Sequence, residues 1–157
     1  MFWLLLIFFY PRPFFINGIL IINTNNFTPK NLGLAKWENN PLENKSILNK
    51  YRTIQVTMTD LVKTALEEFE LTPKEKARST NMFALGLLYW LYERDLQSTI
   101  DFLNKKFSKK PVIASANIKA LKAGYFYGET IEAIKTTCKV DKAEFKKGIY
   151  RNIMGNN

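Results

Sequence analysis

An uncharged run of eleven residues, Met82 to Tyr92, is the feature that most constrains how this chain can fold. It follows the segment 72–75, TPKE, in which threonine and glutamate can cap a helix and proline can take its first position. Together they predict one helix of about twenty residues, apolar on every side in its second half. Eleven residues cannot cross the roughly 30 Å hydrocarbon layer of a membrane. We therefore expect this helix to be buried in a large core or at an interface, with part of its surface unpartnered and the chain only marginally stable.

The residues before this helix alternate between strand and helix patterns. Short apolar runs at 18–23 and 53–58 predict two strands, and the second places Ile54, Val56 and Met58 on one side. Between them, Thr28 before a proline predicts a helix start, followed by an Asn-rich loop. An amphipathic pattern at 59–69 predicts the next helix.

The residues after the apolar run continue the alternation. We expect Asp95 to cap a helix, Pro111 to lie near the start of an Ala-rich helix, and residues 136–140 to form a third strand around Cys138, a small core residue. The order of elements predicts an α/β fold, with a mixed sheet of a few strands and several packed helices, incomplete as it stands.

Missing residue types exclude several kinds of chemistry. The chain has no histidine and one cysteine, which excludes histidine-based triads, histidine metal sites, disulfides within the chain and cysteine-ligated clusters. It also lacks the common glycine-rich phosphate loops and the nucleophile elbow. We therefore predict no catalytic residue and no metal site, and a single cysteine suits the cytoplasm.

The chain is basic, with a formal net charge of +9. From Asn104 onward there are twelve Lys and Arg against four Asp and Glu, mostly as lysine pairs without an Arg-rich run. Solvated helix faces explain this pattern better than a nucleic-acid site, which usually adds arginines and exposed aromatic side chains. A basic nucleic-acid-binding module stays open as the alternative, with salt-dependent retention of DNA or RNA as its signature.

The first sixteen residues, 1–16, form an apolar stub. Their nine-residue apolar run is too short to span a bilayer, has no preceding positive charge, and is followed by Pro-Arg-Pro. A signal peptide or a membrane anchor is the less favoured interpretation. We expect residues 1–16 to lie outside the evolved domain and the protein to have no membrane partner.

Four long segments together resemble a known family: 19–43, 59–94, 116–130 and 148–156. They are similar to the later part of the gamma domain in the alpha subunit of bacterial 2-oxoacid:ferredoxin oxidoreductases, the 2-oxoglutarate synthase type. Several blocks in the right order are far more specific than one short motif. The resemblance implies a gamma-domain-like fold, with residues 17–145 as a partial gamma domain and 146–157 as a connector, so that the chain is a fragment truncated at both ends.

The resemblance also implies an activity for the whole enzyme. The family oxidatively decarboxylates a 2-oxoacid to an acyl-CoA and passes electrons to ferredoxin, using thiamine diphosphate, coenzyme A and iron–sulfur clusters. A beta subunit and ferredoxin are the implied partners. We expect this chain alone to bind none of these cofactors and to be inactive.

A few residues are candidates for binding or interface roles. Tyr125, Tyr127 and Glu129 line a nucleotide groove in one interpretation and simply pack at a helix end in the other. Asn81 is either a functional amide at an interface or a polar residue bonded on a buried helix surface. Arg151 and Asn152 either contact a neighbouring domain or belong to a solvated connector.

Overall fold

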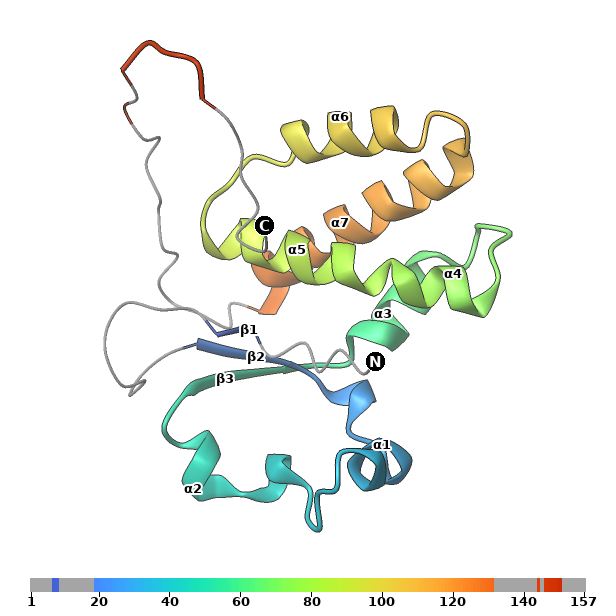
Figure 1. Ribbon diagram of the computed structural model, residues 1–157. Helices are drawn as coiled ribbons and strands as arrows, with labels where there is room; N and C mark the ends of the chain where they lie inside the picture. The colour runs from blue at the N-terminus through green and yellow to red at the C-terminus, as the bar shows by residue number, and fades with distance from the viewer. Residues whose placement is uncertain (1–6, 9–18, 132–143, 145, 151–157) are drawn as a thin grey trace.

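The computed structural model describes residues 7–8, 19–131, 144 and 146–150. Within these ranges a small sheet has helices on both sides, so the predicted α/β fold with a mixed sheet is confirmed (Figure 1). The predicted third strand at 136–140, with Cys138, lies outside the described residues. The elements in chain order are β1 (Ile7–Phe8), β2 (Ile19–Asn23), η1 (Thr24–Asn26), α1 (Pro29–Leu34), η2 (Pro41–Glu43), α2 (Lys45–Leu48), β3 (Arg52–Val56), α3 (Met58–Ala65), α4 (Pro73–Arg78), α5 (Thr80–Leu91), α6 (Gln97–Lys106) and α7 (Pro111–Ile131).

The sheet has the order β1-β2-β3, with β1 antiparallel and β3 parallel to the central strand β2. Ile21 on β2 pairs with Ile54 on β3. Four of the five β2 residues are buried, as expected for a central strand, whereas β3 alternates buried and exposed residues. β1 comes from the apolar stub that the sequence placed outside the domain.

The end of β2 is joined to the start of α3 by a network of asparagine side chains. Asn23 is 6% exposed, and its Oδ1 accepts from the backbone N–H of Met58 at 3.1 Å. Asn25 Oδ1 accepts from the N–H groups of Thr59 and Asp60 at 2.9 and 3.4 Å. These side chains therefore cap α3 from more than thirty residues away in the chain, in place of a local N-cap.

The longest helices, α5 and α7, form the main packing pair of the structure (Figure 1). A hypothetical Cβ on Gly124 would lie 1.9 Å from the carbonyl oxygen of Phe83, and one on Gly86 would lie 1.9 Å from that of Leu121. The two backbones thus touch where side chains are absent. Ala120, about one turn of α7 before Gly124, is also small and buried, so small residues follow one another along this side of the helix.

Helix α5 packs against other helices of its own chain along its buried side. Phe83, Leu87 and Leu91 are at most 1% exposed and join Ile21 and Val56 in one core cluster. None of the large apolar side chains of α5 is among the exposed ones in the described ranges. α7, α3 and α4 pack around the helix, but Leu85, Leu88 and Trp90 are only half-buried, so the expected unpartnered surface stays a prediction.

Three further boundary predictions need correction. The Asn-rich loop at 38–50 contains the short helices η2 and α2. Met58 does not continue β3 but begins α3, where its side chain is still buried. Asp95 does not cap α6, because Leu96 occupies the N-cap position without a side-chain bond.

The predicted twenty-residue helix is two helices, α4 and α5, separated at Ser79. Ser79 has φ −73° and ψ −9°, and its N–H bonds to the carbonyl of Lys76, the tighter i→i+3 type. The apolar periodicity continues across this single residue, so the sequence pattern does not reveal the break. The capping box at 72–75 is confirmed.

Directly after this break, the hydroxyl oxygen of Thr80 is buried without a hydrogen-bond partner among the described residues. Because a buried hydroxyl without a partner costs free energy, Thr80→Val, which keeps the shape, is expected to raise the free energy of unfolding by about 1 kcal/mol. Urea denaturation checks this. Thr80→Ser keeps the hydroxyl and is the control, and a Val variant less stable than this control would contradict the expectation.

Candidate functional site

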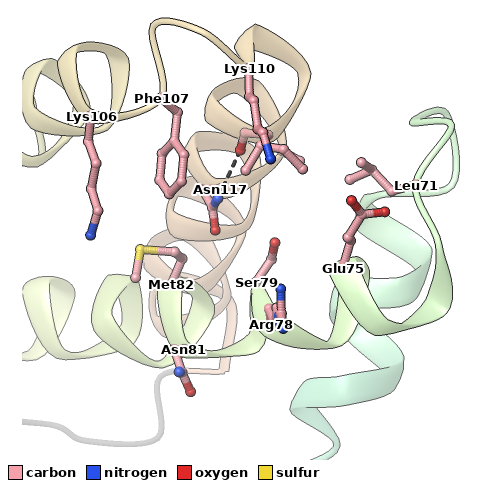
Figure 2. Close-up of a pocket in the computed structure, with 12 residues that line it drawn as sticks. Leu71, Glu75, Arg78, Ser79, Asn81, Met82, Lys106, Phe107, Lys110 and Asn117 are labelled. Carbon is pink, nitrogen blue, oxygen red and sulfur yellow. Dashed lines mark hydrogen bonds between the residues drawn. The ribbon is translucent and has the colours of Figure 1, made fainter.

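A groove of about 340 Å³ opens where the start of α5 faces the turn between α6 and α7 (Figure 2). Its volume falls in the range of small-molecule pockets. The lining combines three cations, one carboxylate, polar side chains and an apolar wall. The residues are Leu71, Glu75, Arg78, Ser79, Asn81, Met82, Lys106, Phe107, Lys110, Ile113, Ala116 and Asn117.

The capping box fixes the α4 side of the groove. Glu75 Oε2 accepts from the backbone N–H of Thr72 at 2.9 Å and from its hydroxyl at 2.7 Å, while Glu75 N–H donates to Thr72 Oγ1 at 3.3 Å. The turn that follows α6 fixes the other side. Lys110 N–H donates to the carbonyl of Phe107 at 2.7 Å, and Pro111 then begins α7.

Polar side chains point into the groove from both sides. Asn117 Nδ2 donates to the carbonyl of Ile113 at 2.8 Å, which leaves its Oδ1 facing the space above Ser79 (Figure 2). Ser79 is 3% exposed, and its side chain makes no capping hydrogen bond to α5. In Figure 2 the Ser79 oxygen and the Lys110 amine point toward each other across the groove.

The hydrogen bonds from Thr72 are the largest cause that holds the pKa of Glu75 below its ordinary value of 4.5, helped by the positive charges of Lys110 and Arg78. A carboxyl group with a lowered folded-state pKa stabilises the protein above its unfolded pKa. That contribution is lost as pH falls through the folded pKa.

We therefore expect Glu75→Gln to lower the melting temperature at pH 7, and the difference from the unsubstituted chain to shrink as pH falls below about 4.5. Glutamine keeps an acceptor for the Thr72 amide and removes only the charge. Thermal melts of both proteins at several pH values measure the difference. A difference that grows toward low pH would contradict the assigned cause.

The structure brings one predicted site residue to the groove. Asn81 lines it, but its side chain is exposed, so the interpretation of a bonded amide on a buried helix surface was wrong. Its interface role stays a prediction. Arg151 and Asn152 lie outside the described residues.

The aromatic candidates lie farther along α7, away from the groove. Tyr127 packs its ring 5.6 Å from that of Phe83, beside the core, and Tyr125 makes an edge contact with Phe126 at 5.9 Å. Glu129 is exposed. These positions fit the packing interpretation of the two tyrosines, and the nucleotide groove there stays a prediction.

Sequence reasoning missed most of the groove. From the sequence, the lysine pairs around residues 105–110 were predicted to lie on solvated helix faces. Lys106 and Lys110 agree with this in part, because both are exposed, but they also line the groove. One signal in the sequence could have indicated the groove. A proline begins both α4 and α7, and these two prolines fix the helix starts that border the groove.

The described residues do not fit the metal-containing groups of the resembled family. They contain no group of three or more His, Cys, Asp or Glu side chains able to hold a metal ion. Thiamine diphosphate sites need oxygen ligands for a divalent cation, and iron–sulfur clusters need several thiolates, whereas the whole chain has one cysteine. Within the same ranges, no helix combines the length and apolarity needed to cross a bilayer.

Comparison with known proteins places the chain in a family. Residues 16–127 match the family described as pyruvate ferredoxin/flavodoxin oxidoreductase. The chain is also similar to the 2-oxoglutarate oxidoreductase subunit KorA of Mycobacterium tuberculosis (strain ATCC 25618 / H37Rv), with 44% identity over 141 residues. That alignment covers 90% of this chain and 21% of the relative, so the chain spans about a fifth of the relative's length. No solved structure matches it significantly.

The family match extends over more than half of the chain, from just before β2 to within α7. It therefore includes the parallel strands, the asparagine network and the α5–α7 contact at Gly86 and Gly124. The groove between α4–α5 and the α6–α7 turn also lies within the matched residues. This chain belongs to the pyruvate ferredoxin/flavodoxin oxidoreductase family.

Proposed function

We propose that this chain is part of the alpha subunit of a 2-oxoacid:ferredoxin oxidoreductase that acts on 2-oxoglutarate in the cytoplasm. The single observation that supports this most strongly is the 44% identity to the mycobacterial 2-oxoglutarate oxidoreductase subunit. In this proposal, residues 17–145 are a partial gamma domain and residues 146–157 a connector to the next domain.

The whole enzyme would use thiamine diphosphate, coenzyme A and iron–sulfur clusters, with a beta subunit and ferredoxin as partners. Thiamine diphosphate supplies the carbanion chemistry of decarboxylation and the clusters carry single electrons. In this proposal the chain has a structural role in the enzyme. Its α5–α7 pair and small sheet would form a packed module against which catalytic domains assemble, and Asn81, Arg151 and Asn152 are proposed contacts to them.

A chimaera tests this function directly. Residues 19–127 of this chain replace the aligned segment of the mycobacterial subunit, which is produced together with the other subunits of its enzyme. We expect the chimaera to reduce a viologen dye with 2-oxoglutarate and coenzyme A, and more slowly with pyruvate. The chain by itself is the control and is expected to show no turnover.

Two results would count against the proposal. One is turnover by the isolated chain, because it would mean that the catalytic machinery lies within these 157 residues. The other is a chimaera that assembles with its partner subunits but has lost all 2-oxoglutarate-dependent activity. Size-exclusion chromatography of the chimaera separates failed assembly from failed chemistry.

A further inference from the structure

Residues 24–53, between β2 and β3, lie outside the buried core. Each of their side chains that the structure describes is at least partly exposed. Helix α1 lies in this segment and takes part in none of the main packing pairs between the described elements. In Figure 1 these residues form an arc beyond β3, away from α5 and α7. A connection of this length is usually functional, and the family match covers all of it.

Two large apolar side chains at the end of α1 are exposed to solvent. Trp37 is 39% exposed and Leu34 is 55% exposed. They are three residues apart, so at most about 11 Å of chain separates them and one partner surface can contact both. Single exposed apolar side chains are common on soluble proteins, but tryptophan is among the residue types most enriched where binding energy concentrates.

The backbone after α1 fixes the position of Trp37. Lys36 has φ 57°, in the left-handed region that a residue with a side chain adopts only at a cost. This conformation lets the N–H of Lys36 bond to the carbonyl of Gly33 at 3.1 Å and the N–H of Trp37 to that of Leu32 at 3.0 Å. The indole also stacks on the ring of Phe27, with the ring centroids 6.2 Å apart. A tryptophan held in this way loses little conformational freedom when a partner covers it.

The small size of this apolar surface indicates what can cover it. The exposed parts of Trp37 and Leu34 amount to roughly 200 Å², whereas a stable interface between separate proteins needs about 800 Å² on each partner. A second copy of the chain would therefore not stay bound through these side chains alone. A domain in the same polypeptide needs less contact, because linkage keeps it at a high local concentration. The alignment covers only 21% of the mycobacterial relative, so the relative has residues enough for such domains.

We propose that the outer face of the arc docks against another domain of the same subunit, with Trp37 as the anchor and Leu34 beside it. The inference rests on the proposed function, in which this chain is part of a longer alpha subunit. The docked domain would present an apolar socket for the indole, with carboxylates at its rim. Lys30 and Lys36 favour such a rim, because both are exposed and neither forms an ion pair with a described residue.

Hydrogen exchange measured by mass spectrometry tests this contact. The chimaera described above, produced with its partner subunits, is compared with the full chain by itself. α1 has six residues, too few for a helix to be stable alone, so its amides are expected to exchange quickly in the full chain. In the chimaera we expect exchange in residues 29–37 to be about tenfold slower, because docking suppresses local opening.

Substitutions measured in both proteins identify the side chains responsible. Trp37→Ala is expected to abolish the tenfold difference, and comparison of the two proteins cancels the loss of the Phe27 stack, which affects both. Leu34→Gln is expected to reduce the difference to about threefold. Its matched control is Val112→Gln, which makes a 50% exposed apolar side chain on α7 polar and is expected to leave the difference unchanged.

Three results would overturn the proposal: equal exchange in the chimaera and the full chain, a tenfold difference that persists in Trp37→Ala, or its loss in Val112→Gln. A dimer of the full chain that Trp37→Ala dissociates in sedimentation experiments would assign the face to a second copy instead.

Two further comparisons keep the test decisive. If the chimaera does not fold, the protection factors of α1 in the full chain are compared with those of the aligned segment in the intact mycobacterial subunit, and equal values would overturn the proposal. Protection without turnover in the chimaera would contradict only the proposed function. Turnover without protection would contradict only this inference.

Discussion

Gly124→Ala is expected to lower the free energy of unfolding by about 3 kcal/mol or more. The added Cβ would lie 1.9 Å from the carbonyl oxygen of Phe83 and 2.9 Å from its Cα. Backbone atoms cannot rotate away as a side chain can, so α5 and α7 must separate along their whole contact. Thermal denaturation should show a fall of roughly 10 °C.

Alanine substitutions at two other glycines serve as comparisons for the stability effect of Gly124→Ala. A Cβ on Gly128 would meet the ring of Trp90 at 2.5 Å, and because a side chain can shift, Gly128→Ala is expected to cost about 1–2 kcal/mol. Gly33 in α1 has nothing within 4 Å, so Gly33→Ala should stabilise the chain by about 0.5–1 kcal/mol. If Gly124→Ala melts within two degrees of the unsubstituted chain, the close helix contact is not present in solution.

Asn23→Leu is expected to cost about 3 kcal/mol, the second large effect. Leucine has nearly the same shape, but it removes the acceptor for the N–H groups of Met58 and Asn25 and the donor to Thr59 Oγ1. Because Asn23 is buried, water cannot replace these bonds fully. Urea denaturation measures the loss, and amide exchange should be faster at Met58.

The control for this substitution is Asn104→Ala. Asn104 is exposed on α6 and its side chain makes no hydrogen bond with a described residue, so the change should stay within about 0.5 kcal/mol. An Asn23→Leu variant as stable as this control would mean that the asparagine network does not hold β2 to α3. If hydrogen exchange at the Met58 amide is no faster in the Asn23→Leu variant than in the unsubstituted chain, the same conclusion follows.

The sequence predicted the elements whose signals are local. The capping box at 72–75 and the proline starts of α1 and α7 depend only on neighbouring residues, and all three are confirmed. The start of α3 was misplaced because Met58 fits both the alternation of β3 and the apolar face of the helix. The atom that decides between them is Oδ1 of Asn23, thirty-five residues away, which no local pattern contains.

The groove was missed for a similar reason. Its two sides are about thirty residues apart in sequence, and each side alone reads as an ordinary amphipathic helix end. The packing of α5 against α7 places the two sides opposite each other, with the Ser79 oxygen and the Lys110 amine pointing toward each other (Figure 2). Nothing in the residues around Ser79 indicated that this serine would be buried, at 3% exposed.

The asparagine cap of α3 has a consequence for the order in which this chain folds. α3 has eight residues, fewer than an isolated helix needs to be stable in water, and its first N–H groups have no acceptor until β2 is in place. We therefore expect β2 and α3 to open and close together, as one cooperative unit in native-state hydrogen exchange. Strand β3 lies between β2 and α3 in the chain and pairs in parallel with β2. We expect β3 to belong to the same unit, because its pairing with β2 closes the loop between β2 and the start of α3.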